Sequence, residues 1–174
     1  MSRLLALVLR HRPDRWGVSL DAGGWTDVEE LLAALRRHGT DLGRADLDRV
    51  VAGGDKQRFR YDPTGTRVRA SQGHSVPVDL GLTPRRPPDE LWHGTPERVL
   101  AAVLAAGLRP GRRHAVHLSA DVETARQVGS RRGRAVVLVV AAGRMHTDGH
   151  VFTRSDNGVW LVATVPPAYL TVSA

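Results

Sequence analysis

The chain has 174 residues, of which 41% are hydrophobic, and its 25 basic and 18 acidic residues give a formal net charge of +7. A chain of this length can bury one good core or two small ones, and we expect two lobes. The absence of cysteine excludes disulfide bonds and thiolate metal sites, and no apolar run approaches the length that spans a bilayer.

The positive charge comes almost entirely from arginine, because Lys56 is the only lysine. Arginine binds phosphate in a bidentate manner, so this composition suits a polyanionic partner such as nucleic acid. GC-rich codon usage also favours arginine, so charge alone does not separate a nucleic-acid enzyme from a binding module. The first residues lead directly into a helical pattern instead of a signal peptide, and we therefore expect a cytoplasmic protein without a membrane partner.

The first half of the sequence is predicted to begin with a helix. Its apolar stripe runs from Leu4 to Val8, and Pro13 disfavours helical geometry at the preceding residue. Arg10 and His11 therefore lie in the last helical turn. Basic residues there commonly complement the negative end of the helix dipole, which is the simplest interpretation of this pair taken alone.

A second helix has a clear signal. The residues Thr26-Asp27-Val28-Glu29 fit a capping box in which the Thr26 hydroxyl and the Glu29 carboxylate satisfy amides at the helix start, and Gly39 supplies the stop. The other elements predicted for this half are a short strand and turn over 17–25, a helix over 45–52, and a β-hairpin with strands 58–61 and 66–69. Three helices followed by a hairpin is the layout of a winged helix, an architecture that commonly binds nucleic acid.

The hairpin leads into the stretch on which the functional prediction depends, Arg67-Val68-Arg69-Ala70-Ser71-Gln72-Gly73-His74-Ser75. On a strand, Arg67 and Arg69 share one face. Polar side chains then follow around Gly73, a residue that lets the backbone approach a ligand closely. The stretch would suit a phosphate, although alternating arginines on a hairpin also form ordinary solvated faces.

The second half follows a proline-rich segment, residues 76–89, that we interpret as a linker. A strand beginning at Glu90 is predicted to lead into a helix with Thr95 as its N-cap and Pro96 at the first helical position. The run 135–140 is apolar throughout, so we expect this strand in the middle of the lobe. The remaining elements are predicted as a helix over 121–128 and strands over 115–119, 151–152 and 159–162.

Two histidines stand on short predicted strands of this half. His93 and His117 are each next to small polar residues, so they either orient a ligand from neighbouring strands or are satisfied core histidines. A glycine-flanked loop with Arg109, Arg112 and Arg113 offers a cradle for a pyrophosphate. We expect no metal, because no His-x-x-x-His pair or acidic partner stands near these positions. The chain also has no Walker loop and no Rossmann glycine fingerprint.

Eight short motifs resemble, in the same order, those of the NAD-dependent RNA 2′-phosphotransferases, the bacterial and archaeal relatives of the enzyme that finishes tRNA splicing in eukaryotes. The motifs are Leu9-Arg10-His11-x-Pro13, Gly24-Trp25, Asp55-Lys56-Gln57-Arg58-Phe59, Arg69-Ala70-x-Gln72-Gly73-His74-Ser75, Trp92-His93-Gly94-Thr95, Val116-His117-Leu118-Ser119, Val128-Gly129-x-Arg131-x-Gly133 and Asn157-Gly158-Val159-Trp160-Leu161. The resemblance covers residues 4–170, so it applies to both predicted lobes.

The resemblance implies an α+β fold of two lobes. Residues 1–80 would form an N-terminal winged-helix-like lobe that binds RNA, and residues 85–174 a C-terminal ADP-ribosyltransferase-like lobe that binds NAD, with the active site in the cleft between them. Family members transfer an internal RNA 2′-phosphate to NAD in two steps. The phosphate first displaces nicotinamide to give an RNA-2′-phospho-ADP-ribose, and the ribose O2″ then attacks phosphorus and releases 2′-OH RNA and ADP-ribose 1″,2″-cyclic phosphate.

The resemblance also assigns site residues. The family's catalytic Arg-His-Arg-Arg set corresponds to Arg10, His11, Arg69 and Arg131. Contacts to NAD are expected from His93, Gly94, Thr95, Arg113, His117, Ser119 and Val159, and contacts to RNA from Lys56, Arg58, Gln72, His74 and Ser75. No metal is implied, and we expect a monomer.

Val159 stands at the third position of the triad that marks ADP-ribosyltransferase folds, where glutamate would repel the incoming phosphate. Small departures from the family pattern occur at Trp92, where tyrosine or another residue is common, and at Arg132, where histidine is often seen. Neither position belongs to the proposed catalytic groups.

Two alternative functions remain open at the level of sequence. ADP-ribosylation of terminal phosphates on RNA or DNA needs only the first chemical step, and the same site would perform it. A winged-helix RNA-binding protein whose second lobe has lost catalysis is the non-enzymatic alternative, which the retention of all four expected catalytic residues disfavours.

Overall fold

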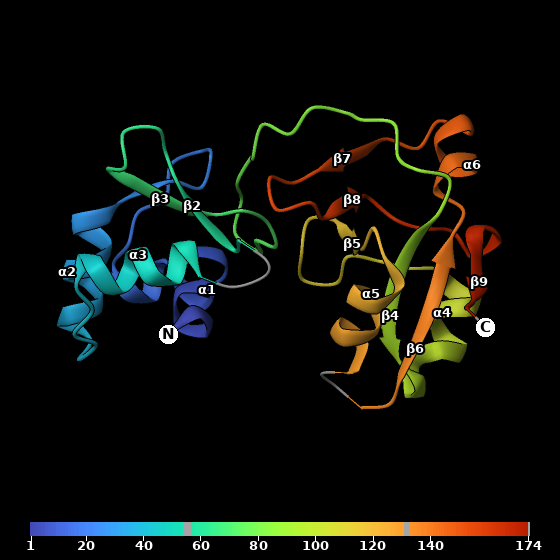
Figure 1. Cartoon of the computed structure of the whole chain (residues 1–174), viewed down its shortest axis with the longest axis horizontal. Helices are drawn as coiled ribbons and strands as arrows, with labels where there is room; N and C mark the ends of the chain where they lie inside the picture. The colour runs from blue at the N-terminus through green and yellow to red at the C-terminus, as the bar shows by residue number, and fades with distance from the viewer. Residues whose placement is uncertain (54–56, 131–132, 174) are drawn as a thin grey trace. The chain divides into compact units, whose positions relative to one another are not determined.

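The computed structural model describes residues 1–53, 57–130 and 133–173. The chain divides into two compact units, Met1–Gly81 and Leu82–Ala174, and each unit has its own hydrophobic core. Both units combine helices with small antiparallel sheets (Figure 1), which confirms the predicted α+β class. The boundary between the units lies in the proline-rich segment 76–89.

The first unit places its helices on one small sheet. Its elements are α1 (Ser2–Arg10), the 3₁₀-helix η1 (Asp14–Trp16), β1 (Thr26–Asp27), α2 (Val28–Arg37), α3 (Arg44–Ala52), β2 (Phe59–Tyr61) and β3 (Arg67–Ala70). The sheet is antiparallel with the order β1-β3-β2. The predicted hairpin is confirmed as β2 and β3, whereas β1 and η1 were not predicted. The short strand predicted within residues 17–25 is wrong, because this segment forms turns instead.

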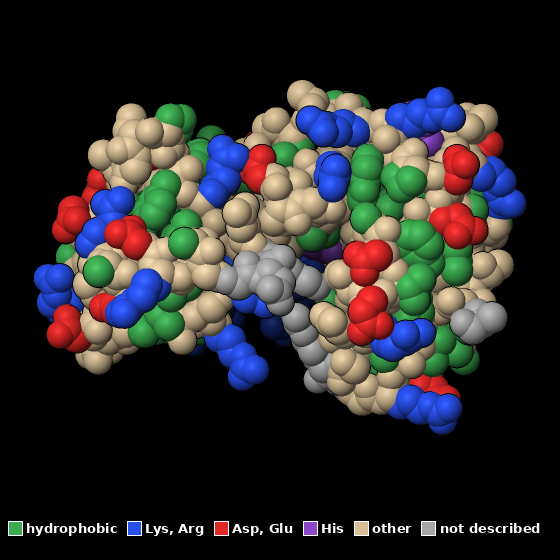
Figure 2. Space-filling model, viewed as in Figure 1, with side chains coloured by type: hydrophobic (Ala, Val, Ile, Leu, Met, Phe, Trp, Pro, Cys, Tyr) green, Lys and Arg blue, Asp and Glu red, His purple; other side chains and the backbone are tan. Residues whose placement is uncertain are grey.

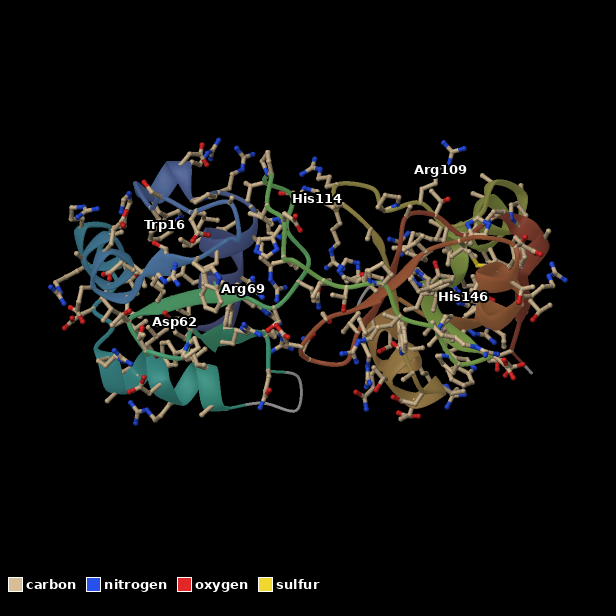
Figure 3. All side chains as sticks on the ribbon, turned by 90° about the horizontal axis from the view of Figure 1, so that it is seen from above. Trp16, Asp62, Arg69, Arg109, His114 and His146 are labelled. Carbon is tan, nitrogen blue, oxygen red and sulfur yellow. The ribbon has the colours of Figure 1, made fainter. Side chains whose placement is uncertain are left out.

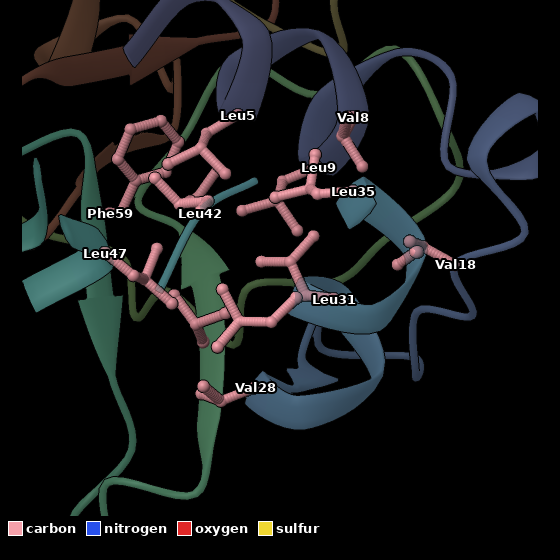
Figure 4. Close-up of a cluster of buried hydrophobic side chains, with 14 residues drawn as sticks. Leu5, Val8, Leu9, Val18, Val28, Leu31, Leu35, Leu42, Leu47 and Phe59 are labelled. Atoms are coloured by element: carbon pink, nitrogen blue, oxygen red, sulfur yellow. The ribbon is translucent and has the colours of Figure 1, made fainter. Parts of the chain in front are cut away.

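The core of this unit is built from the apolar stripes of α1 and α2 and the inner face of the hairpin (Figure 4). Leu5 and Leu9 of α1 and Leu31 of α2 are fully buried in it. Because side chains alternate along a strand, Val68 points into this core while Arg67 and Arg69 belong to the opposite face of β3.

Helix α2 begins one residue later than the sequence predicted. Asp27 is its N-cap, and the Asp27 carboxylate accepts hydrogen bonds from the amides of Glu29 and Glu30 at 2.8 and 3.0 Å. Thr26 is instead paired with Val68 in β1 and is buried. The prediction of Thr26 as the cap is therefore wrong, because strand pairing holds this residue in the sheet and the helix can begin only after it.

The second unit contains two small antiparallel sheets. Its elements are β4 (Leu91–Pro96), the 3₁₀-helix η2 (Glu97–Val99), α4 (Leu100–Ala106), β5 (Val116–Leu118), α5 (Val122–Gly129), β6 (Ala135–Val140), α6 (Ala142–Thr147), β7 (Phe152–Arg154), β8 (Trp160–Val162), the 3₁₀-helix η4 (Pro167–Tyr169) and β9 (Leu170–Val172). The sheet orders are β4-β6-β9 and β5-β8-β7. The apolar strand β6 is central in its sheet, as predicted, whereas α6 and β9 were not predicted.

A backbone bridge links the two sheets. The amide of Trp92 donates to the carbonyl of Ser119 at 3.0 Å, and the amide of Ser119 donates to the carbonyl of Trp92 at 2.8 Å. This bridge sets β4 beside β5. The predicted helix start at Thr95 and Pro96 is wrong, because both residues remain in β4 and pair with β6, and α4 begins only after η2.

Strand β4 passes very close to α5 at Gly94. A Cβ atom added to Gly94 would lie 1.8 Å from the carbonyl oxygen of Ala125 and 2.8 Å from the amide nitrogen of Gly129. Both neighbours are backbone atoms that cannot move without displacing the helix. Only glycine fits at this position, and its role is to let the strand and the helix touch.

Candidate active site

Arg10 ends α1 and is folded back onto the hairpin of its own unit. Its Nη2 donates to the carbonyl oxygen of Arg58 at 3.3 Å, and its Cζ lies 5.8 Å from the centre of the Phe59 ring. The residue is only 8% exposed. Complementing the helix dipole would not require such burial, so the position of Arg10 favours a more specific role.

The loop after β3 is fastened to this helix end. Nδ1 of His11 and Oγ of Ser75 form a hydrogen bond of 2.9 Å, and the amide of Ser75 donates to the carbonyl of Arg10 at 2.8 Å. At the other end of the loop, Oγ of Ser71 donates to the carbonyl of Gln57 at 2.8 Å. These bonds hold the imidazole of His11 beside the polar stretch that follows the hairpin.

Arg69 lies against a turn that is distant in sequence. Its Nη1 donates to the carbonyl of Gly23 at 3.0 Å, and its Cζ lies 4.5 Å from the centre of the Trp25 ring. The carboxylate of Asp21 shapes the turn by accepting hydrogen bonds from the amides of Gly23 and Trp25, both at 2.9 Å. Arg69 is consequently 6% exposed.

The two arginines of β3 differ in their surroundings. Arg67 forms ion pairs with Asp21 and Asp62, both at 3.3 Å, and its side chain is 48% exposed. A hydrogen bond from the Arg67 amide, together with the Thr64 hydroxyl and the Arg67 guanidinium, lowers the pKa of the Asp62 carboxyl. The interpretation of a solvated hairpin face therefore fits Arg67 and does not fit the buried Arg69.

The other RNA-contact residues expected in this unit have varied surroundings. Arg58 donates from Nη1 to the Ser2 hydroxyl at 3.4 Å. His74 is buried beside Gly24, and a Cβ atom added to Gly24 would lie 3.4 Å from Nε2 of His74. Gln72 is partly exposed. Lys56 lies outside the described residues.

The two histidines of the second unit are held in one tautomer. Nδ1 of His93 bonds the carbonyl oxygen of His117 at 3.0 Å, and Nδ1 of His117 bonds the carbonyl oxygen of Ala115 at 2.9 Å. A carbonyl only accepts, so both Nδ1 atoms carry hydrogen, and in the neutral rings both Nε2 atoms are acceptors. Burial lowers the pKa of His93, and the nearby charge of Arg113 lowers it further.

The remaining residues expected to contact NAD lie on or next to these strands. Gly94 and Thr95 follow His93 in β4, Ser119 is the bridge partner of β4, and Val159 precedes β8 with its amide bonded to Oγ of Ser155 at 3.2 Å. Arg131 lies outside the described residues.

Arginines are spread widely over both units. On the face seen in Figure 2 they occur together with acidic side chains, and Figure 3 shows Arg109 extending away from the ribbon. Arg109, Arg112 and Arg113 are all exposed.

Among the helices of the described residues, none is long and apolar enough to cross a membrane. The same residues hold no group of three histidine or acidic side chains placed to bind a metal ion.

Comparison with known proteins identifies the family. Residues 1–164 match the model of "RNA 2′-phosphotransferase, Tpt1 / KptA family". A relative from Streptomyces griseus is 54% identical over 98% of this chain and 94% of its own length. Relatives from Agrobacterium fabrum and Streptomyces coelicolor are also 54% identical, over 99% and 100% of this chain and 93% and 94% of their own lengths. All three carry the name "Probable RNA 2′-phosphotransferase". The chain belongs to this family of transferases.

The sequence analysis gave no role to Trp25, which belongs to this site. It stands in one of the quoted motifs, and Arg60, Arg67 and Arg69 all lie within 5.6 Å of its ring centre. Arginines alternate along both strands of the hairpin, at positions 58, 60, 67 and 69. This pattern is the signal that could have indicated a residue contacted by several of them on one face of the sheet.

Proposed function

We propose that this protein removes internal 2′-phosphates from RNA by transferring them to NAD, which is consumed as a co-substrate. A phosphate oxygen attacks C1″ of the NAD ribose and expels nicotinamide, which gives an RNA-2′-phospho-ADP-ribose. The ribose O2″ then attacks the phosphorus. The products of this second step are 2′-OH RNA and ADP-ribose 1″,2″-cyclic phosphate.

The observation that carries the proposal is the burial of two guanidinium groups. Arg10 and Arg69 are the only buried arginines in the part of the chain that the structure describes. Burying a charge is costly, so buried arginines in a protein with so many exposed ones are candidates for ligand binding. Both are also members of the catalytic set that the family resemblance assigns.

The catalytic residues act on the phosphate in both steps. A phosphate nucleophile is already ionised and needs no strong general base, so positioning and charge stabilisation dominate the first step. Arg10, Arg69 and Arg131 hold its oxygens in line. In the second step the phosphoryl oxygens gain charge and the same arginines stabilise it. His11, oriented by Ser75, exchanges a proton with the 2′ oxygen.

The second unit holds NAD. His93 and His117 accept hydrogen bonds from ribose hydroxyls through Nε2, for which the neutral state of His93 is suited. Thr95 and Ser119 contribute polar groups from the linked strands, Gly94 offers its backbone to NAD next to His93, and Arg113 binds the pyrophosphate. Val159 keeps the site free of a carboxylate that would repel the RNA phosphate.

RNA is bound chiefly by the first unit. In this proposal it is winged-helix-like, and Lys56, Arg58, Gln72, His74 and Ser75 contact the RNA around the phosphate. The second unit is ADP-ribosyltransferase-like, and one chain holds a complete set of catalytic residues, so the enzyme acts as a monomer without a metal.

A short RNA with one internal 2′-phosphate tests the proposal. Incubation with NAD is expected to release nicotinamide and 2′-OH RNA, while RNA that lacks the 2′-phosphate releases neither. Arg10→Ala should abolish most of the activity without unfolding the chain. No NAD-dependent loss of phosphate from a folded wild-type protein would sink the proposal, and transfer of ADP-ribose to terminal phosphates alone would replace it with ADP-ribosylation.

A further inference from the structure

The pairing of β2 with β3 places two arginines directly opposite each other. Arg60 and Arg69 are register partners in this antiparallel pair, so their Cβ atoms lie about 4.5 to 5.5 Å apart on one face. Phe59, Val68 and Ala70 alternate onto the other face and are buried in the core. Like charges in directly opposite positions destabilise a sheet, so folding alone does not account for the pair.

Trp25 lies against both guanidinium groups. Cζ of Arg69 is 4.5 Å and Cζ of Arg60 is 5.1 Å from the centre of its ring. Cation–π attraction to the shared indole offsets part of the repulsion and keeps the two charges together on the sheet face. Arg67 also contacts this ring, at 5.6 Å, but its guanidinium forms ion pairs with two carboxylates.

The substrate of the proposed reaction carries two neighbouring anionic groups. In RNA with an internal 2′-phosphate, the same ribose bears a 3′-phosphodiester on the adjacent carbon. A site for such a nucleotide needs two phosphate-binding groups side by side, whereas a terminal nucleotide with a free 3′-hydroxyl needs only one. Adjacent guanidiniums meet this need, because each can bind one phosphate through charge-assisted hydrogen bonds.

We propose that Arg60 binds the 3′-phosphodiester of the nucleotide whose 2′-phosphate is held by Arg69, and that Arg60 thereby selects internal over terminal 2′-phosphates. This inference rests on the proposed function, since it takes Arg69 as the ligand of the 2′-phosphate. Trp25 has a positioning role, because it presents the two guanidiniums as a pair.

Two RNA oligonucleotides that differ at a single position test the assignment. Each ends in a 2′-phosphorylated nucleotide, and the 3′ oxygen of that nucleotide carries a methyl phosphodiester in one and hydrogen in the other. Arg60→Gln is expected to lower kcat/KM about 10- to 100-fold for the diester RNA, the value of one charge-assisted contact, and less than about threefold for the hydroxyl RNA. Arg60→Lys should restore part of the selectivity, since it keeps the charge without the fork.

Arg67→Gln is the matched control. It removes the same charge from the same sheet face and the same indole, and it should change kcat/KM for the two RNAs by the same factor. Thermal unfolding of each variant establishes that the fold is intact. Equal losses on both RNAs for Arg60→Gln, or no loss on either, would overturn the role of Arg60.

Binding without NAD separates this inference from the proposed function. Calorimetry should show wild type binding the diester RNA about 10- to 100-fold more tightly than the hydroxyl RNA, and Arg60→Gln binding both alike. If this difference occurs in a protein that releases no nicotinamide, the proposed function fails and the role of Arg60 stands. Turnover without any difference in affinity would contradict the role of Arg60 and leave the proposed function in place.

Discussion

The two arginines of β3 lie on the same face of the strand but differ in exposure and in the groups that they contact. Arg67 is half-exposed and neutralised by two carboxylates, which is the ordinary state of an arginine on a hairpin. Arg69 is buried against the ring of Trp25 and bonded to a backbone carbonyl. A guanidinium held in this way has lost much of its conformational freedom before any ligand arrives, which is what transition-state stabilisation requires.

Arg69→Ala is expected to lower kcat/KM for 2′-phosphorylated RNA by about two to three decades, because a charge-assisted contact in a dry site is worth roughly 3 to 4 kcal/mol. Arg69→Lys should recover little, since an ammonium group lacks the bidentate fork. Arg67→Ala removes the same charge from an exposed neighbour and should reduce kcat/KM less than about tenfold. Steady-state kinetics checks all three, and near-wild-type turnover of a folded Arg69→Ala variant would end the assignment.

His93 should make the stability of the protein depend on pH. Burial lowers the pKa of His93 below the ordinary value of 6.5 that it regains on unfolding. Between these two pKa values the unfolded chain binds a proton that the folded chain does not, so the free energy of unfolding decreases as the pH falls below about 6.5. His93→Asn can keep a donor for the carbonyl of His117 but cannot titrate.

Urea unfolding of the wild type and His93→Asn at about pH 5 and about pH 7.5 measures this contribution. The wild type should lose more stability than the variant on acidification. An identical loss in both proteins would show that His93 does not titrate differently in the folded and unfolded states.

At the scale of elements, the start of α2 gives a pair of opposite predictions. Asp27→Ala removes the N-cap and should reduce the free energy of unfolding by about 1 kcal/mol. Thr26→Val should be neutral or stabilising, because Oγ1 of Thr26 is buried and bonds no polar atom of the described residues. Chemical denaturation distinguishes them, and a larger loss for Thr26→Val than for Asp27→Ala would restore the capping box expected from the sequence.

The sequence predicts those elements whose signals are local. Periodicity identified α2 and the β2–β3 hairpin, and an unbroken apolar run identified the central strand β6. The strands that escaped prediction, β1 and β9, exist because they pair with β3 and β6 far along the chain. The site follows the same rule. The family motifs indicate Arg10 and Arg69, but the burial of Arg10 depends on contacts between α1 and the hairpin. The position of Arg60 beside Arg69 depends on strand register. In a hairpin the register follows from the turn type and the loop length, and the sequence analysis did not assign the turn type.

The contact between β4 and α5 should tolerate no side chain at Gly94. Gly94→Ala would place a Cβ atom 1.8 Å from the Ala125 carbonyl oxygen, so the helix must shift and the free energy of unfolding should fall by about 1 to 3 kcal/mol or more. Gly43→Ala is a suitable control, because the nearest atom to its added Cβ is 3.5 Å away, and it should cost less than about 1 kcal/mol. Equal unfolding midpoints for the two variants would contradict the close approach.

At the scale of the whole molecule, the proposed catalytic set is divided between the two units. Arg10, His11 and Arg69 belong to the first unit and Arg131 to the second, while the residues proposed for NAD all belong to the second. Each unit has its own core, so each can hold its own groups in place. The proposed reaction nevertheless needs both units at one phosphate, either from one chain or exchanged between two copies.

Mixing two inactive variants distinguishes these arrangements. Arg69→Ala is defective in the first unit and His93→Ala in the second, and we expect their mixture to remain as inactive as either alone, because a monomer must build its site from one chain. If copies exchanged units, mixed pairs would combine one intact first unit with one intact second unit and would recover up to about a quarter of wild-type activity. The two variants should be unfolded and refolded together so that any exchange can occur. As a control, wild type is refolded with an equal amount of Arg69→Ala, and this mixture should have about half the activity of wild type alone at the same total protein concentration. Recovery of nicotinamide release in the variant mixture, rising with protein concentration, would overturn the monomeric enzyme and place the active site in a pair of chains.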